Sequence, residues 1–91
     1  MSEQEAMQQL IDRYDCEIYQ SPWGVNAYYR EVHLQISFEE ALQKWGNGNI
    51  WVKNKQVWST GEFARSDKLT SQELFALLDT YLPKKAQMSL F

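Results

Sequence analysis

The sequence predicts a small α+β domain in which helices cover one face of a mainly antiparallel sheet. Apolar residues recur at three- and four-residue spacing near both ends of the chain, which is typical of amphipathic helices. Alternating apolar and polar residues, separated by turn-forming residues, predict strands in the middle. Ninety-one residues provide one core. We therefore expect one domain over residues 1–83, ordered α-β-β-α-β-β-α, and a flexible tail over residues 84–91.

Three helices are predicted, each beginning at a capping hydroxyl that a glutamate follows three residues later. These pairs are Ser2 with Glu5, Ser37 with Glu40, and Thr70 with Glu73. The first helix covers about residues 3–14. The second begins after Ser37, uses Ala41, Leu42 and Trp45 as its apolar side, and ends at Gly46. The third ends at Pro83, which cannot continue a helix.

Four strands are predicted between these helices. A short strand at residues 16–19 precedes a turn at residues 21–24. Residues 28–36 alternate, with apolar Val32, Leu34 and Ile36 on one side and the polar residues on the other. Residues 50–59 form a hairpin if Asn54 and Lys55 make its turn. In that register Val52 and Val57 face the core, and Trp51 and Trp58 share the opposite face.

Composition excludes several classes of protein. Cys16 is the only cysteine, so no intramolecular disulfide and no cysteine-based metal site can form. The N-terminal residues are acidic and polar, unlike a secretory signal, and no apolar run approaches the ~20 residues of a membrane span. We expect a cytoplasmic protein that has no membrane association, no metal and no cofactor.

The net charge of −3 hides an asymmetry between the two halves of the chain. Residues 1–43 hold eight acidic and two basic residues, whereas residues 44–91 hold seven basic and four acidic ones. Halves of opposite sign permit a basic face on an acidic protein, although scattered solvating charge is an equally good interpretation.

The final five residues, Gln87-Met88-Ser89-Leu90-Phe91, carry the clearest functional motif. They resemble the Gln-x-Ser/Asp-Leu-Phe peptides with which bacterial polymerases, clamp-loader subunits and mismatch-repair proteins bind the DNA sliding clamp. The resemblance implies that Leu90 and Phe91 fill an apolar pocket of the clamp, that Gln87 hydrogen-bonds beside it, and that Met88 and Ser89 bridge them. At average residue usage, the fixed Gln, Leu and Phe coincide in roughly one chain in several thousand.

Three hypotheses follow, and none of them is an enzyme. The first is a non-enzymatic accessory or regulator of replication or repair that docks on the clamp. The alternative for the motif is that Leu90 and Phe91 pack into the core of their own domain. The second is an inhibitory or counter-defence protein of phage or plasmid origin that binds a host protein through its acidic half. The third is a single-stranded DNA-binding module whose rings stack on bases and whose cations follow phosphates. Its candidate residues are Trp51, Lys53, Lys55, Trp58 and Arg65.

The sequence contains no recognisable catalytic motif. His33 is the only histidine and lies on the polar side of a predicted strand, where we expect it to face solvent. The sequence contains no glycine-rich phosphate loop, because residues 46–49 lack the required spacing and lysine. No small-molecule substrate is indicated.

Overall fold

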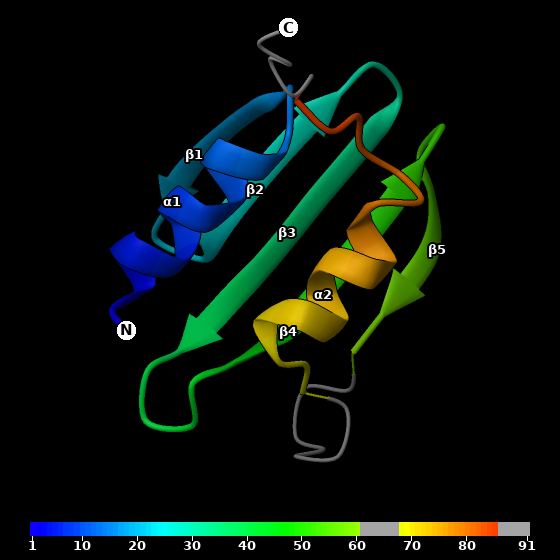
Figure 1. Cartoon of the computed structure of the whole chain (residues 1–91). Helices are drawn as coiled ribbons and strands as arrows, with labels where there is room; N and C mark the ends of the chain where they lie inside the picture. The colour runs from blue at the N-terminus through cyan, green and yellow to red at the C-terminus, as the bar shows by residue number, and fades with distance from the viewer. Residues whose placement is uncertain (61–67, 86–91) are drawn as a thin grey trace, which may run out of the picture.

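The computed structural model describes residues 1–60 and 68–85, and these form a small α+β domain with an open sheet (Figure 1). The elements follow the chain in this order: α1 (Glu3–Arg13), β1 (Glu17–Ser21), β2 (Gly24–Tyr29), β3 (Val32–Glu39), β4 (Lys44–Val52), β5 (Lys55–Ser59) and α2 (Ser71–Leu78). The strands form an antiparallel meander in which each strand pairs with its neighbours in sequence, from β1 to β5. The predicted fold class is confirmed.

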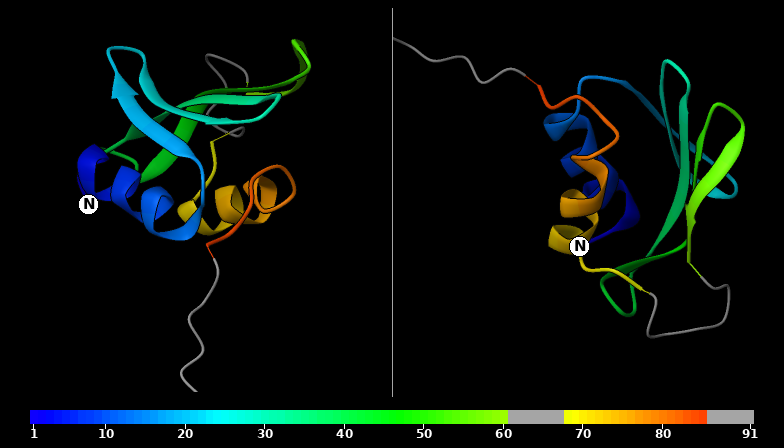
Figure 2. Two further views of the ribbon diagram at one scale, coloured as in Figure 1. Left: turned by 90° about the horizontal axis from the view of Figure 1, so that it is seen from above. Right: turned by 90° about the vertical axis from the view of Figure 1, so that its right-hand side faces the viewer.

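Both helices pack on the same face of the sheet, as the two views of Figure 2 show. Helix α1 contacts β1 and β3, and α2 contacts β4. The core lies between the two layers, and it comprises buried apolar side chains from both helices and from β2, β3 and β4. Its largest fully buried residues include Trp45, Tyr14 and Leu10. The opposite face of the sheet, which we call the outer face, carries no helix of the described chain.

The first and last predicted helices begin where their capping boxes place them. Ser2 accepts a hydrogen bond from the Glu5 amide and Glu5 accepts one from the Ser2 amide, and Thr70 and Glu73 form the same reciprocal pair. Each box satisfies two backbone donors that the first helical turn leaves without partners. The glutamate of each box consequently has a lowered pKa, because the capping residue's backbone N–H donates to its carboxylate.

Strand β3 has the predicted alternation. Leu34, Ile36 and Phe38 are buried against the helices, whereas His33, Gln35 and Ser37 point to the outer face. The period-two pattern extends three residues beyond Ile36, so the strand continues to Glu39.

The predicted middle helix at residues 37–46 is wrong. Phe38 and Trp45 lie opposite each other on β3 and β4, with their rings edge-to-face at a centroid distance of 5.0 Å. A tight turn over residues 40–43 joins the strands, and Gln43 adopts a positive φ of 54° there. So short a helix has little stability of its own, and burial of the cross-strand Phe–Trp pair favours the strands. Leu42, which belonged to the expected apolar stripe, is exposed.

The predicted hairpin turn is also wrong by one residue. Lys53 and Asn54, with φ values of 52° and 65°, form the two-residue turn, and Val52 pairs with Lys55. Two positive φ angles match the twist that favours such hairpins. A register shift between Ile50 and Trp51 then pairs Ile50 with Trp58.

The last described residues attach the C-terminal end of the domain to α1. Lys84 pairs with Tyr14, and the Lys85 amide donates to the Arg13 carbonyl at 2.8 Å, so both lysines are fixed to the end of α1 through their backbones. Neither helix of the described chain has the length and hydropathy needed to cross a membrane.

Candidate functional site

The outer face of the sheet combines aromatic and uncharged polar side chains. Strand register places two rows there. The first runs Tyr28, His33 and Trp51 from β2 to β4, and the second runs Asn26, Gln35 and Asn49 across the same strands. Because neighbouring side chains on one face of a sheet interact across the strands, each row forms a connected surface.

The aromatic residues of the outer face form a stacked row of Tyr19, Tyr28, His33 and Trp51, which we call the aromatic row. Tyr28 and His33 lie 4.2 Å apart between centroids with an interplanar angle of 10°, and His33 and Trp51 lie 4.9 Å apart. Tyr19 continues the row at 5.8 Å from Tyr28. The rings in the middle of the row stack on each other, so their faces are covered and only their edges are open to a ligand.

His33 lies on the polar side of β3 as predicted, but it does not simply face solvent. It is wedged between Tyr28 and Trp51, and its buried Nε2 has no hydrogen-bond partner within the described part of the chain. Burial lowers the His33 pKa, because a charged imidazolium loses more hydration there than the neutral ring. Its Nε2 therefore forms no hydrogen-bonded pair with an acid or a nucleophile of the described residues.

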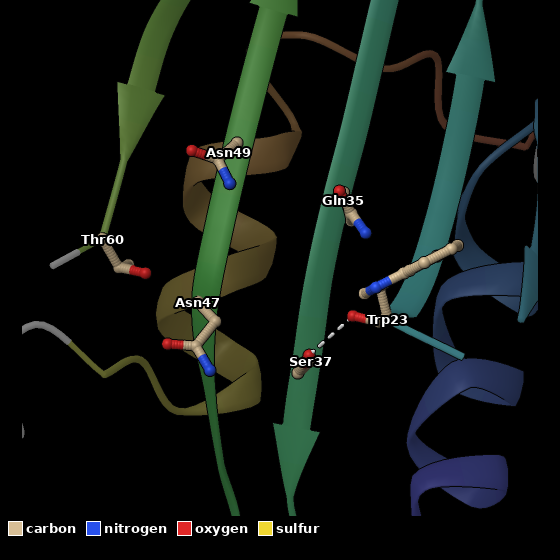
Figure 3. Close-up of a pocket in the computed structure, with 6 residues that line it drawn as sticks. All are labelled: Trp23, Gln35, Ser37, Asn47, Asn49 and Thr60. Carbon is tan, nitrogen blue, oxygen red and sulfur yellow. Dashed lines mark hydrogen bonds between the residues drawn. The ribbon is translucent and has the colours of Figure 1, made fainter. Parts of the chain in front are cut away.

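Beside the aromatic row lies a hollow of about 380 Å³, which we call the Trp23 pocket. Among the described residues, it is lined by Trp23, Gln35, Ser37, Asn47, Asn49 and Thr60. Figure 3 shows the pocket with the helices behind the sheet, which places it on the outer face. Trp23 stands on one side, Gln35 and Ser37 come from β3 in the middle, and the other three residues stand opposite. Every one of these side chains is uncharged.

Trp23 is the most exposed large apolar residue of the described chain, at 74%. Its turn is nevertheless well fixed. The Ser37 hydroxyl donates to the Trp23 carbonyl at 3.0 Å, and the Trp23 amide donates to the Ser21 hydroxyl at 3.3 Å. Gly24, with φ of 128°, completes the turn where a Cβ would lie 2.6 Å from the Ile36 carbonyl oxygen. The backbone thus holds a large ring in solvent.

The amide side chains of the pocket are partly unused. Among the described residues, Gln35 and Asn47 make no side-chain hydrogen bond, while Asn49 accepts one from Gln56. Asn47 sits in β4 with a φ of 50°, where the register of β3 and β4 shifts. Asparagine adopts this left-handed conformation more readily than most residues. Asn47 and Asn49, two residues apart, line the same pocket.

Comparison with known proteins gives no assignment. No protein-family model, no curated protein and no solved structure matches this chain. The residues themselves therefore carry the functional argument.

The structure places the two tryptophans predicted to bind nucleic acid on opposite faces of the sheet. Trp51 lies on the outer face, whereas Trp58 packs against the core on the helix side, because the shifted register pairs it with Ile50. Lys53 sits in the hairpin turn, 4.0 Å from Glu31, and Lys55 is exposed next to it. Arg65 lies outside the described residues. The prediction that Trp51 and Trp58 share one face of the sheet is therefore wrong.

The clamp-like peptide also lies outside the described residues, since the description ends at Lys85 and the motif occupies residues 87–91. The described core is formed by side chains between Ala6 and Leu82. The prediction for Gln87, Met88, Ser89, Leu90 and Phe91 thus stays a prediction.

The remaining charged cluster has a structural role. Arg13 at the end of α1 donates to both oxygens of Asp79 at the end of α2, and the Tyr14 hydroxyl donates to the same carboxylate at 2.7 Å. Arg13 lowers the Asp79 pKa to about 2, and burial raises the Tyr14 pKa. These bonds join the two helix ends. No group of histidine, cysteine or acidic side chains in residues 1–60 and 68–85 is arranged to hold a metal ion.

Cys16 has no reactive environment. Burial, and secondarily the nearby Asp15, raise the pKa of its thiol. A raised pKa keeps the thiol protonated, and a protonated thiol is a poor nucleophile.

Sequence reasoning missed the Trp23 pocket, although one signal was present. Gln35 was already placed on the polar side of its strand, and Asn47 and Asn49 alternate two residues apart. Once β4 is recognised as a strand, the same alternation puts all three amides on one face. The wrong helix at residues 37–46 concealed this.

Proposed function

We propose that this chain is a small non-enzymatic accessory or regulator of bacterial DNA replication or repair that docks on the sliding clamp through residues 87–91. The single observation that carries this proposal is the match of Gln87, Ser89, Leu90 and Phe91 to the clamp-binding pattern. The proposed partner is a cytoplasmic protein, so the same proposal places this chain in the cytoplasm.

The architecture of the described domain supports the proposal. Its core is built from residues 6–82, and its last backbone pairings are those of Lys84 and Lys85 with the end of α1. The motif begins two residues after this anchor. A peptide that binds in a groove must be separate from the domain that carries it, and this spacing is compatible with that requirement.

Magnitudes set the expected affinity. Burying Leu90 and Phe91 contributes about 1.5–3 kcal/mol each before the ordering costs of the peptide are subtracted. The two side chains together contribute at most about 6 kcal/mol, so by themselves they support a dissociation constant no tighter than tens of micromolar. A weak tether still raises the local concentration of the domain near clamp-bound DNA and near other clamp-bound factors.

The test is titration of purified bacterial clamp with the full chain and with a version that lacks residues 87–91. The full chain should bind and the truncated chain should not. A Leu90→Ala, Phe91→Ala double variant should bind roughly a hundredfold more weakly, the ratio expected for losing about 3 kcal/mol. Met88→Ala is the matched control, because the motif permits any residue there, and it should bind like the unmodified chain. Equal affinities for the full and truncated chains would refute clamp docking.

The counter-defence hypothesis predicts a different result. A host protein other than the clamp should then be retained by the truncated chain as strongly as by the full chain, in the absence of DNA. Charge reversal in the acidic N-terminal half, for example at Glu17, should weaken that retention.

A further inference from the structure

The Trp23 pocket has the features of a ligand site that the core does not need. A hollow of about 380 Å³ lies at the small end of the range for ligand pockets. Trp23 forms an open aromatic wall, and the other lining residues of the described chain carry hydrogen-bonding side chains. An exposed Trp makes no contribution to core packing at this position, yet three hydrogen-bonding or steric constraints hold its turn.

The chemistry of the lining selects an uncharged ligand with both donors and acceptors. A primary amide offers an acceptor oxygen beside two N–H donors, so Gln35 and Asn47 can each form a paired hydrogen bond with a complementary edge. No carboxylate, lysine or arginine lines the pocket among the described residues. Lys68, whose side chain lies beside Gly46 of β4, is paired with Glu39.

We propose that the Trp23 pocket binds an unpaired nucleobase of a single-stranded nucleic acid. Trp23 stacks on the flat face of the base, as aromatic side chains do in proteins that bind single strands. The amides of Gln35 and Asn47 read its edge, the pairing that asparagine and glutamine make with bases. The base must be unpaired, because a base inside a duplex cannot present its face to a ring on a sheet surface.

The aromatic row adds a neighbouring surface. His33 and Trp51 lie two residues from Gln35 and Asn49 along β3 and β4. Two strand residues advance about 6.7 Å, so the nucleotide next to the bound base reaches the edges of these rings. Tyr28 and His33 of this row also line a second hollow together with Arg30, Lys53 and Glu31. Lys53 is paired there with Glu31 at 4.0 Å, and Arg30 offers a cation to a phosphate.

The residues assigned to this site lie between positions 23 and 60, so the proposal does not require clamp docking through residues 87–91. It differs from the earlier hypothesis of nucleic-acid binding, which placed the stacking residues at Trp51 and Trp58. Trp58 has no role here because it packs against the core. The two proposals are also separated by experiment, because the assay below contains no clamp.

The test is a fluorescence titration of the full chain with short homopolymers of each DNA base, with their RNA counterparts, and with a duplex of mixed sequence. Single strands should quench tryptophan emission, with a preference for one base, and the duplex should not. The DNA and RNA arms show which backbone the protein prefers. Because base contacts outnumber phosphate contacts, the affinity should fall only weakly with salt, with a log–log slope shallower than about −2.

Variants separate the site from the fold. Trp23→Ala should weaken binding about five- to hundredfold, the range for losing one stacked base, and its exposed position should leave the thermal midpoint unchanged. Asn47→Gly keeps the left-handed backbone and should weaken binding several-fold with an altered base preference. Leu42→Ala, an exposed apolar residue in the turn at residues 40–43, is the matched control and should bind normally.

Three results would overturn the proposal: no quenching by any single strand, equal binding of duplex and single strand, or normal binding by Trp23→Ala. Quenching by a neutral oligosaccharide such as maltohexaose, in place of every oligonucleotide, would also overturn it and assign the pocket to a sugar.

Discussion

Replacing Gly48 by alanine tests the packing of Trp58 from β5 and Ile36 from β3 against β4. An added Cβ at this position would lie 2.8 Å from the Trp58 ring and 2.9 Å from the Ile36 side chain. Atoms of a core cannot remain at such distances, so Trp58 and Ile36 must shift. Overpacking of this kind costs about 1–3 kcal/mol, while the lower entropy of the unfolded alanine chain offsets about 0.4–1 kcal/mol. We expect a net loss of about 1–2 kcal/mol.

The assay is urea unfolding followed by circular dichroism, compared with two other glycine variants. Gly46→Ala is the matched control in the same strand, because its Cβ meets the flexible Lys68 side chain at 3.2 Å, and its stability should stay within about 0.5 kcal/mol of the original. Gly24→Ala should lose the most, because its φ of 128° and the Ile36 carbonyl oxygen at 2.6 Å leave no relief. If Gly48→Ala were as stable as Gly46→Ala, Trp58 would not pack on the helix side of the sheet.

Two further predictions concern pH, and both are read from thermal unfolding midpoints. Burial lowers the His33 pKa, so the unfolded chain binds the proton more readily and the stability should fall as pH drops from about 7 to 5. His33→Gln should remove this dependence of the midpoint on pH. If the dependence were unchanged in that variant, the result would contradict the stacked geometry of His33. The Asp79 pKa is lowered from 3.8 to about 2, so its bonds to Arg13 and Tyr14 contribute stability above roughly pH 4 that is lost toward pH 2. Asp79→Asn should lower the midpoint at pH 7 and flatten the acid limb, whereas an unchanged midpoint would show that the pair does not join the helices.

The parts of the fold that depend on local chemistry were predictable from the sequence. Both capping boxes lie at the helix starts, since the Ser or Thr hydroxyl and the Glu carboxylate are in the same few residues. The faces of β3 also followed from alternation, because burial of one sheet face enforces a period of two.

The parts that depend on contacts between distant residues were not predictable. The spacing of Phe38, Leu42 and Trp45 fits one face of a helix, and only the pairing of Phe38 with Trp45 across two strands decides for the sheet. The hairpin turn at Lys53 and Asn54 differs from the expected one by a single residue, and that shift, together with a bulge, moves Trp58 to the other face.

The candidate sites divide in the same way. The clamp-like peptide is a linear motif, so the sequence alone can indicate it. The Trp23 pocket joins a turn, two strands and Thr60, and its residues are spread from position 23 to position 60. No local pattern contains it, and only the register of β3 and β4 brings its amides together.

Competition for the clamp tests the central claim most directly. A synthetic peptide of residues 84–91 is added to a complex of the full chain and bacterial clamp, beside a peptide in which Leu90 and Phe91 are alanine. Clamp docking predicts that the first peptide displaces about half of the chain at a concentration near the chain's own dissociation constant and nearly all of it at about a hundredfold higher concentration, and that the second peptide displaces almost none over this range. Retention of the chain on the clamp in the presence of saturating first peptide would contradict it.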